Sequence, residues 1–278
     1  MPLRVRRFLR KMRGGAQAHL LEAEDGHCYV VKFRNNPQHR RILVNEWVSA
    51  TFLGHLRISA PEAAFLDVTE DFLQDNPGVH MALGQKRVPV EPGWHFGSRY
   101  PGDPALLAVY DFLPDTLLPS VLNLHEFLGA LVFDKWMGNA DSRQAIFFRA
   151  VVRPWAPQPA GQGFVAAMID HGYVLGGPNW TFADSPVQGL YFRRLVYETV
   201  TGLDHFQPWL DMVQHFPEEV VDQALRGLPP QWLNGDMATL ESLLEKLMRR
   251  RPRVSGLIEE CAREKSGVFP RWRAAGVR

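Results

Sequence analysis

The sequence predicts an α+β protein of two lobes, a small β-rich lobe over residues 1–100 and a mainly helical lobe over residues 101–278. Short apolar runs separated by turn residues fill the first region, a pattern typical of strands. Apolar residues three and four positions apart dominate after residue 123, a pattern typical of helices. In the middle of the chain, two carboxylates lie at the ends of apolar strands and indicate a chemical site.

The composition argues against several classes of protein. The 31 Lys and Arg residues balance 30 Asp and Glu residues, which argues against nucleic acid or an anionic membrane as partner. Cys28 and Cys261 are far apart, so they predict neither a disulfide framework nor a thiolate metal site. No apolar run approaches the roughly 20 residues of a membrane span, and the N-terminus lacks a signal-peptide core. We therefore expect a cytoplasmic protein.

A β-hairpin is predicted over residues 18–33, where two apolar runs flank the turn Asp25-Gly26. The segment ahead of it carries adjacent glycines, Gly14 and Gly15, followed by Gln17. Adjacent glycines let backbone N–H groups curl toward an anion, as in loops that cradle phosphates. An ordinary tight turn is the alternative.

Lys32 lies in the otherwise apolar second strand of this hairpin. A lysine there either extends to the surface or points inward, where it needs a partner. In the helix predicted around residues 42–53, Glu46 shares a face with Leu43 and Leu53. A carboxylate in an apolar stripe is a candidate partner for Lys32, and a plain surface position for Glu46 is the alternative.

Residues 60–119 are harder to interpret. Strands are predicted at 61–68 and 79–83, followed by a stretch rich in glycine, proline and aromatic residues over 88–103. Functional loops often have this composition, and an aromatic ring such as that of Trp94 could stack on a base. A long crossover between the lobes is the alternative.

The helical pattern is clear from Asn123 onward. Asn123 and Glu126 resemble a capping box, and the helix that they start is predicted to end at Gly138. Asp236 is a plausible cap of the last predicted helix. The predicted helices that follow the central segment are 190–201, 206–216, 218–226 and 237–250. The basic run Arg249–Arg253 is typical of a helix C-terminus, with a phosphate or nucleic-acid contact as the alternative.

Two short segments place carboxylates at the mouths of neighbouring strands. In the first, a polar loop over residues 139–144 carries Asp141 into an apolar strand, and in the second an apolar strand ends in Asp170-His171-Gly172. Phosphoryl transfer needs one carboxylate to orient the attacking hydroxyl and another, with an amide, to hold Mg²⁺ on the phosphates. Asn139 and Gln144 are the amides nearby.

Taken in order, these elements resemble the HipA-like kinases, a branch of the protein-kinase-like fold related to phosphatidylinositol kinases. The most specific part is Met137–Arg143, which is similar to that family's Gly-Asn-x-Asp loop. The resemblance implies an ATP- and Mg²⁺-dependent kinase in which Asp141 is the catalytic aspartate and Asp170 a metal ligand. The ATP-binding set that we expect comprises Gly14, Gly15, Gln17, Lys32 and Glu46.

The sequence departs from the family pattern at the metal site. The family's metal-binding Asn, five residues after the catalytic Asp, is replaced by Ile146, so Gln144 or Asn139 would have to supply the amide oxygen. A rival register exists because Asp134 and Asn139 have the Asp-x-x-x-x-Asn spacing of ordinary protein kinases. We rank it second, since Asp134 lies in a predicted helix. The chain also begins without the extra N-terminal region of the HipA toxins, which argues against a toxin–antitoxin role.

We therefore expect a kinase that transfers the γ-phosphoryl group of ATP to a hydroxyl acceptor, either a protein or a small molecule. The first alternative is a pseudokinase that binds nucleotide or acts as a scaffold, because Ile146 replaces the expected Asn. The second is a DNA- or protein-binding module that uses the basic arm of residues 4–13 and the run Arg249–Arg253. The balanced total charge argues against the nucleic-acid form of that alternative.

Overall fold

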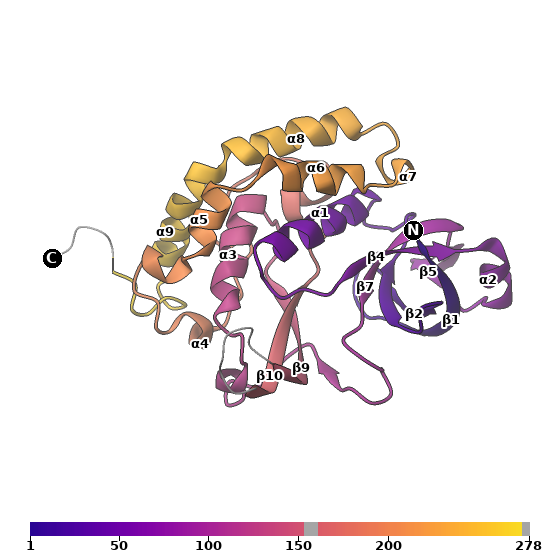
Figure 1. Cartoon of the computed structure of the whole chain (residues 1–278), viewed down its shortest axis with the longest axis horizontal. Helices are drawn as coiled ribbons and strands as arrows, with labels where there is room; N and C mark the ends of the chain where they lie inside the picture. Colours follow the sequence, from indigo (N-terminus) through magenta and orange to yellow (C-terminus); the bar gives the residue numbers. More distant parts are fainter. Residues whose placement is uncertain (153–160, 274–278) are drawn as a thin grey trace.

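The computed structural model describes residues 1–152 and 161–273. A barrel of strands forms one end of the molecule, and most of the helices gather at the other end (Figure 1). A further sheet, which contains β9 and β10, lies below the helices and beside the barrel (Figure 1).

The barrel is a closed sheet of five strands in the order β1-β2-β3-β7-β4. Neighbouring strands of the barrel are antiparallel, except that β1 and β4 pair in parallel and close the barrel. Its interior is apolar and forms a core of its own, including Leu21, Val31 and Leu66. The predicted hairpin is present, with the Asp25-Gly26 turn between its strands. The strands are β1 (Leu3–Lys11), β2 (His19–Ala23), β3 (Cys28–Lys32), β4 (Ala63–Val68) and β7 (Gly93–Arg99).

Within the aromatic segment over residues 88–103, residues 93–99 form the barrel strand β7, not the loop that the composition suggested. β7 pairs with both β3 and β4, and Phe96 is buried there. Packing requires a glycine at position 97, because a Cβ there would lie 2.1 Å from Leu66 Cδ2. Between β4 and β7 the chain forms α2 (Glu70–Asp75) and the hairpin of β5 (His80–Leu83) and β6 (Lys86–Pro89).

The two strands predicted around the central motifs pair with each other. β9 (Gln144–Val152) and β10 (Gly161–Ile169) are antiparallel, with Gln144 opposite Ile169. The short β8 (Val109–Tyr110) adds to the other edge of β9. This register brings the loop before β9 beside the residues that follow β10.

The helices share one large apolar core. At its centre α3 (Glu126–Met137) is almost fully buried, and Gly129 lets α5 approach closely, since a Cβ there would lie 2.4 Å from the Trp209 ring. The predicted helix over 190–201 is reduced to α4, and that over 206–216 is divided between η3 and α5. The remaining helical elements are η1 (Leu118–Ser120), η2 (Val174–Asn179), α4 (Arg194–Tyr197), η3 (Leu203–Phe206), α5 (Trp209–Gln214), α6 (Glu218–Arg226), α7 (Pro230–Leu233), α8 (Met237–Arg249), η4 (Arg251–Arg253) and α9 (Val254–Glu264).

The helix α1 (Arg41–His55) belongs by its packing to this C-terminal core, although it comes from the N-terminal region of the chain. It packs against strand β7 of the barrel and against the helices α6 and α7 (Figure 1). Trp47 of α1 stacks on Phe65 of the barrel with ring centroids 4.1 Å apart, and its indole N–H donates to the carbonyl of Ala224. The boundary between two lobes that we expect at residues 100 and 101 stays a prediction.

Two expected helix caps make long-range contacts instead. The Asn123 side chain bonds both the N–H and the carbonyl of Ala166, and the Glu126 carboxylate accepts the N–H of Ser59. Asp236 is paired with Arg41 of α1. Each side chain satisfies a distant backbone group or charge, which local spacing does not reveal.

Three buried histidines are held neutral by their surroundings. Burial lowers the pKa of His95 to about 3 and that of His19 to about 4, and it lowers the pKa of His171 well below its ordinary value. In the unfolded chain the same side chains titrate near pH 6.5. Below that pH the unfolded state binds more protons than the folded state, so stability falls as the pH falls.

We predict that lowering the pH from 7 to 5 reduces the free energy of unfolding by about 2 kcal/mol for each such histidine. Urea unfolding at the two pH values measures the loss. In His95→Gln the loss should shrink by roughly that amount, whatever the absolute stability of the variant. The exposed His205→Gln is the control and should keep the wild-type difference. An unchanged difference in His95→Gln would contradict the assignment.

Candidate active site

A buried lysine joins two carboxylates from distant elements. Lys32, the last residue of β3, forms an ion pair with Glu46 of α1 and a 2.7 Å contact from its Nζ to Oδ1 of Asp170. The Lys32 side chain is 11% exposed and that of Glu46 only 3%, whereas that of Asp170 is 36% exposed. The structure therefore places Lys32 inward and brings it together with both predicted partners.

Local packing brings the three charges together. Asp170 follows β10 directly in a left-handed conformation (φ 59°), which aspartate tolerates better than most residues. Two residues later, Gly172 lies against α1, and a Cβ there would be 2.5 Å from Ile42 Cγ2. The glycine of the Asp-x-Gly motif thus allows α1 to pack close to Asp170.

Lys32 and Asp170 stabilise each other in their charged forms, whereas burial raises the pKa of Glu46. Burial disfavours the Lys32 ammonium, but the carboxylates of Glu46 and Asp170 outweigh it and raise the pKa of Lys32. Burial also disfavours the ionised form of Asp170, yet Lys32, Arg143 and Gln144 hold its pKa below the ordinary value. Both Lys32 and Asp170 are therefore charged at neutral pH, as phosphate and metal binding require.

The predicted catalytic loop follows α3 as expected. Gly138 ends the helix in the left-handed conformation. Asp141 is exposed, its N–H donates to Oδ1 of Asn139, and its Oδ1 accepts the N–H of Ser142 at 2.7 Å. The Gly189 N–H donates to the Asp141 carbonyl and fixes the loop from the other side. An exposed carboxylate on a braced loop is suited to accept a proton from a hydroxyl group.

The rival aspartate has a structural role. Asp134 is fully buried, and its carboxylate accepts Nε and Nη2 of Arg143 and the amide of Asn139. The Nδ2 of Asn139 donates to Asp134, and its Oδ1 accepts the N–H of Asp141. Both polar ends of the side chain are thus engaged, and the structure does not bring Asn139 to Asp170. Neither side chain reaches the surface from which a substrate would approach.

Arg143 is the residue that sequence reasoning missed. Its side chain is buried, pairs with Asp134, and donates to the carbonyl of Ile169 and to Nδ1 of His171. The neutral His171 donates its other ring N–H to the carbonyl of Met168. Arg143 thus joins the Asp141 loop to the Asp170 turn, and only its position two residues after Asp141 hinted at this.

Gln144 is the amide that lies beside Asp170. Its Nε2 is 3.1 Å from Oδ2 of Asp170. Ile146 is on the same face of β9 but two residues further along, opposite Ala167, so it lies about 7 Å farther from the strand end. Within residues 1–152 and 161–273, no three His, Cys, Asp or Glu side chains form a cluster suited to a metal ion.

The glycine loop between β1 and β2 is braced from two sides. Asn36 donates to the carbonyl of Ala16, and the Gln17 amide bonds both the N–H and the carbonyl of Ala82 in β5 at 2.6 Å. Gly14 has φ 118°, a conformation that favours glycine. The Gln17 side chain is therefore engaged with the hairpin, while Gly14 and Gly15 remain exposed.

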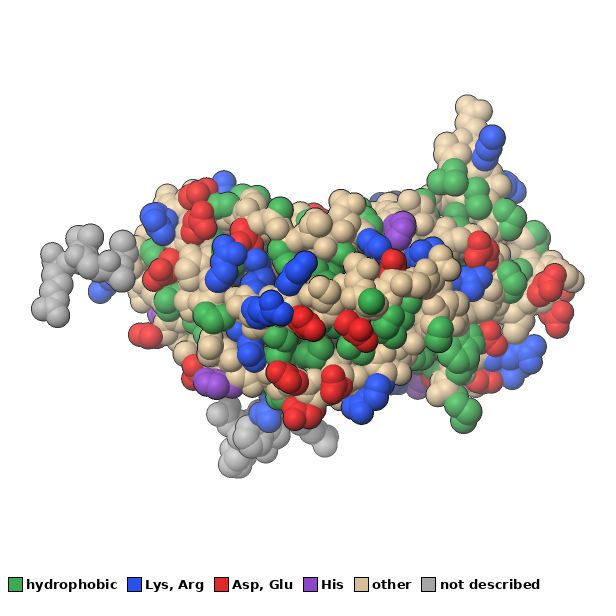
Figure 2. All heavy atoms as spheres, turned by 90° about the horizontal axis from the view of Figure 1, so that it is seen from above, with side chains coloured by type: hydrophobic (Ala, Val, Ile, Leu, Met, Phe, Trp, Pro, Cys, Tyr) green, Lys and Arg blue, Asp and Glu red, His purple; other side chains and the backbone are tan. Residues whose placement is uncertain are grey.

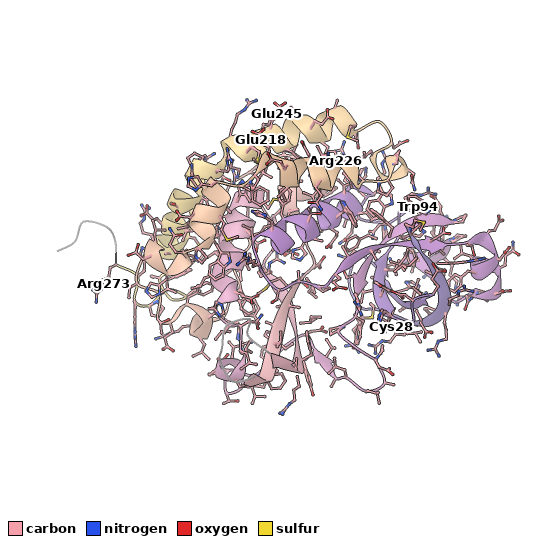
Figure 3. The ribbon with its side chains drawn as sticks, in the orientation of Figure 1. Cys28, Trp94, Glu218, Arg226, Glu245 and Arg273 are labelled. Carbon is pink, nitrogen blue, oxygen red and sulfur yellow. The ribbon has the colours of Figure 1, made fainter. Side chains whose placement is uncertain are left out.

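A cavity of about 1010 Å³ lies between the barrel and the sheet of β9 and β10. Leu20 and Cys28 of the barrel line one wall, and Phe148 and Ala167 of the sheet line the other. Figure 3 shows Cys28 on the barrel edge that faces this sheet, with Trp94 on the opposite side toward α7. Strand β3 runs from Cys28 to Lys32, and β10 runs from the cavity to Asp170, so both walls lead to the ion-pair group.

Comparison with known proteins finds a matching family model and similar solved structures. The family model described as "HipA-like kinase" matches residues 5–147, which include Lys32, Glu46 and Asp141. No curated protein matches the sequence. A crystal structure of the Golgi casein kinase with Mn/ADP bound has a TM-score of 0.52 at 12% identity, over 95% of this chain and 74% of the other. A second crystal structure of the Golgi casein kinase has a TM-score of 0.51 at 13% identity, over 95% and 73%. These likenesses confirm the kinase-like α+β fold.

We predict that breaking the buried Asp134–Arg143 pair destabilises the fold. Arg143→Met leaves the Asp134 carboxylate buried without its main counter-charge, which costs about 3 kcal/mol or more of unfolding free energy. Urea unfolding measures it. Arg7→Met is the control, because it removes an ion pair on the exposed outer face of the barrel, where the loss should be small. Equal losses in the two variants would contradict the structural role of Arg143.

Proposed function

The chain belongs to the family of HipA-like kinases, and on that premise we propose that it transfers the γ-phosphoryl group of ATP to a hydroxyl acceptor with the help of Mg²⁺. The observation that carries the proposal is the contact of Lys32 with both Glu46 and Asp170. A strand lysine paired with a helix glutamate, next to a metal-binding aspartate, is the arrangement by which kinases hold the phosphates of ATP. The three residues come from three separate elements, so their contacts arise from the packing of those elements and not from neighbouring positions in the sequence.

The nucleotide is proposed to lie between a barrel lobe and a helical lobe. The mixed apolar and polar walls of the cavity suit a base and ribose, and the Golgi casein kinase with Mn/ADP bound supports a nucleotide in this fold. From Cys28 to Lys32 the strand covers about 13 Å, which leaves room for a phosphate chain directed toward Lys32. Gly14 and Gly15 would cover the phosphates with backbone N–H groups.

The residues around Asp170 fit Mg²⁺. Magnesium prefers oxygen ligands and commonly uses one or two carboxylates together with substrate phosphates. Asp170 is ionised and partly exposed, and Gln144 lies next to it. Rotation of the Gln144 amide would turn its oxygen toward the cation. When bound, Mg²⁺ would neutralise the negative charge that gathers on the transferred phosphoryl group.

Asp141 is proposed to orient the acceptor hydroxyl and take its proton. Its carboxylate is exposed at the end of the braced loop, and its Oδ1 is held by the N–H of Ser142. Arg143 ties this loop to the carbonyl of Ile169, immediately before Asp170. The proton acceptor and the metal ligand are thus held in one frame, which is the positioning that phosphoryl transfer depends on.

A pseudokinase is the second candidate, and Ile146 favours it. On the cleft-facing side of β9 the position of the family's Asn holds an apolar side chain, so the cation would have one protein ligand fewer unless Gln144 replaces it. Such a protein would bind nucleotide without turnover. A product formed from ATP in a single turnover would exclude this candidate.

The basic surfaces give weaker support for a nucleic-acid partner. Arg250 is buried and bonds the carbonyl of Trp136 as well as Asp184, and Arg251 donates to the carbonyl of Phe216. In Figure 2 acidic and basic side chains lie side by side over the helical end of the molecule.

Over residues 1–152 and 161–273, no helix is both long and apolar enough to cross a membrane.

We predict that ATP binds more tightly with Mg²⁺ than without it, and that Asp170→Ala loses this gain. The gain should be at least about tenfold in the dissociation constant, or 1.4 kcal/mol, because the cation bridges Asp170 and the phosphates. Isothermal titration calorimetry of wild type and variant measures it. Asp222→Ala, an exposed substitution on α6, is the control. Absence of ATP binding by wild type would overturn the nucleotide site.

We predict that Asp141→Asn abolishes phosphoryl transfer and leaves nucleotide affinity within about twofold of wild type. The amide keeps the shape of the side chain but cannot accept the hydroxyl proton, so kcat should fall by about 10²-fold or more. Transfer is followed with [γ-³²P]ATP and a panel of protein and small-molecule hydroxyl acceptors. Equal transfer by wild type and Asp141→Asn would remove Asp141 from the mechanism.

A further inference from the structure

Asn45, the residue before Glu46, is fully buried and bonded on every side. Its Nδ2 donates to the carbonyls of Gly172, Val174 and Gly177, at 2.7, 3.0 and 3.2 Å. Its Oδ1 accepts the indole N–H of Trp180 at 2.9 Å. The orientation of the amide is settled by its partners, because carbonyls only accept and an indole N–H only donates.

All four partners of Asn45 lie within ten residues after Asp170. One side chain of α1 therefore holds the whole segment over residues 172–180 from the inside. Arg41, one helical turn earlier, adds to this contact, since its guanidinium donates to the carbonyl of Pro178 and lies 4.3 Å from the centre of the Trp180 ring. The face of α1 that carries Asn45 is thus fastened to the Asp170 side of the site.

We propose that Asn45 is a positioning residue that makes α1 and the Asp170 segment a single body. The inference rests on the proposed function, in which Glu46 and Asp170 hold Lys32 from two sides. Any outward movement of α1 would take the Asn45 donor away from the carbonyls of three buried residues, which is strongly unfavourable. Glu46 of α1 is therefore held at a fixed position relative to Asp170, and α1 does not act as a switch that moves independently of the Asp170 segment.

The experiment compares a variant of Asn45 with variants of two tryptophans, Trp180, which bonds Asn45, and Trp47, which belongs to α1 itself. Asn45→Asp keeps the shape but replaces the donor with an oxygen that faces three carbonyls. Trp180→Phe deletes the hydrogen bond to Asn45 Oδ1, while it keeps an aromatic ring beneath Arg41, and it serves if Asn45→Asp does not fold. Trp47→Phe is the matched control, because it deletes an indole hydrogen bond of the same kind, to the carbonyl of Ala224 on the other side of the helix.

The first readout is hydrogen–deuterium exchange of the full chain without nucleotide. Asn45→Asp and, to a smaller extent, Trp180→Phe should accelerate exchange in residues 42–53 and residues 170–177 together. Trp47→Phe should leave residues 170–177 unchanged. Acceleration confined to α1 in the Asn45 and Trp180 variants would overturn the inference, because the two segments would then move independently.

The second readout separates positioning from plain stability. Asn45→Asp should bind metal-free ATP within about twofold of wild type but lose about tenfold of the gain that Mg²⁺ gives. A lowered melting temperature with the full Mg²⁺ gain would reduce Asn45 to a structural residue and overturn the proposal. If wild type binds no Mg·ATP, the proposed function fails, and the exchange data alone decide whether Asn45 couples the two segments.

Discussion

The site is organised by the need to satisfy one buried positive charge. Lys32 is at the end of a barrel strand, where water does not reach it freely, and an unpaired ammonium there would be costly. Glu46 and Asp170 supply the counter-charges from α1 and from the turn after β10. Because those elements belong to different parts of the chain, the ion-pair group defines how the barrel, the helix and the sheet meet.

The surrounding polar residues act as braces for that group. Arg143 joins the Asp141 loop to the Asp170 turn, and Asn45 joins the same turn to α1. Gln17 joins the glycine loop to the β5–β6 hairpin. Each of these side chains bonds backbone groups far away in sequence, so each holds a segment in place without itself facing a substrate. The side chain of Asp141 stays exposed on the loop that Arg143 holds.

The periodic and punctuating features of the sequence predicted much of this architecture. The Asp25-Gly26 turn, the end of α3 at Gly138 and the pair of strands around the central motifs were expected and are present. The aromatic stretch that became β7 was misjudged, because Gly97 reads as a loop residue and is in fact required by the approach of Leu66. Composition describes a segment alone, whereas the strand is stabilised by neighbours on both sides.

By itself the sequence determined which residue types stand at the ends of which elements: a strand lysine, a helix glutamate, and aspartates after a helix and after a strand. Only the tertiary structure decided which of them meet. It paired Lys32 with both Glu46 and Asp170, buried Asp134 under Arg143, and placed Gln144 rather than Asn139 beside Asp170. The physical reason is that periodicity sets the face on which a side chain lies, while its partner depends on how separate elements pack, as for Lys32 and Asp170, which are 138 residues apart.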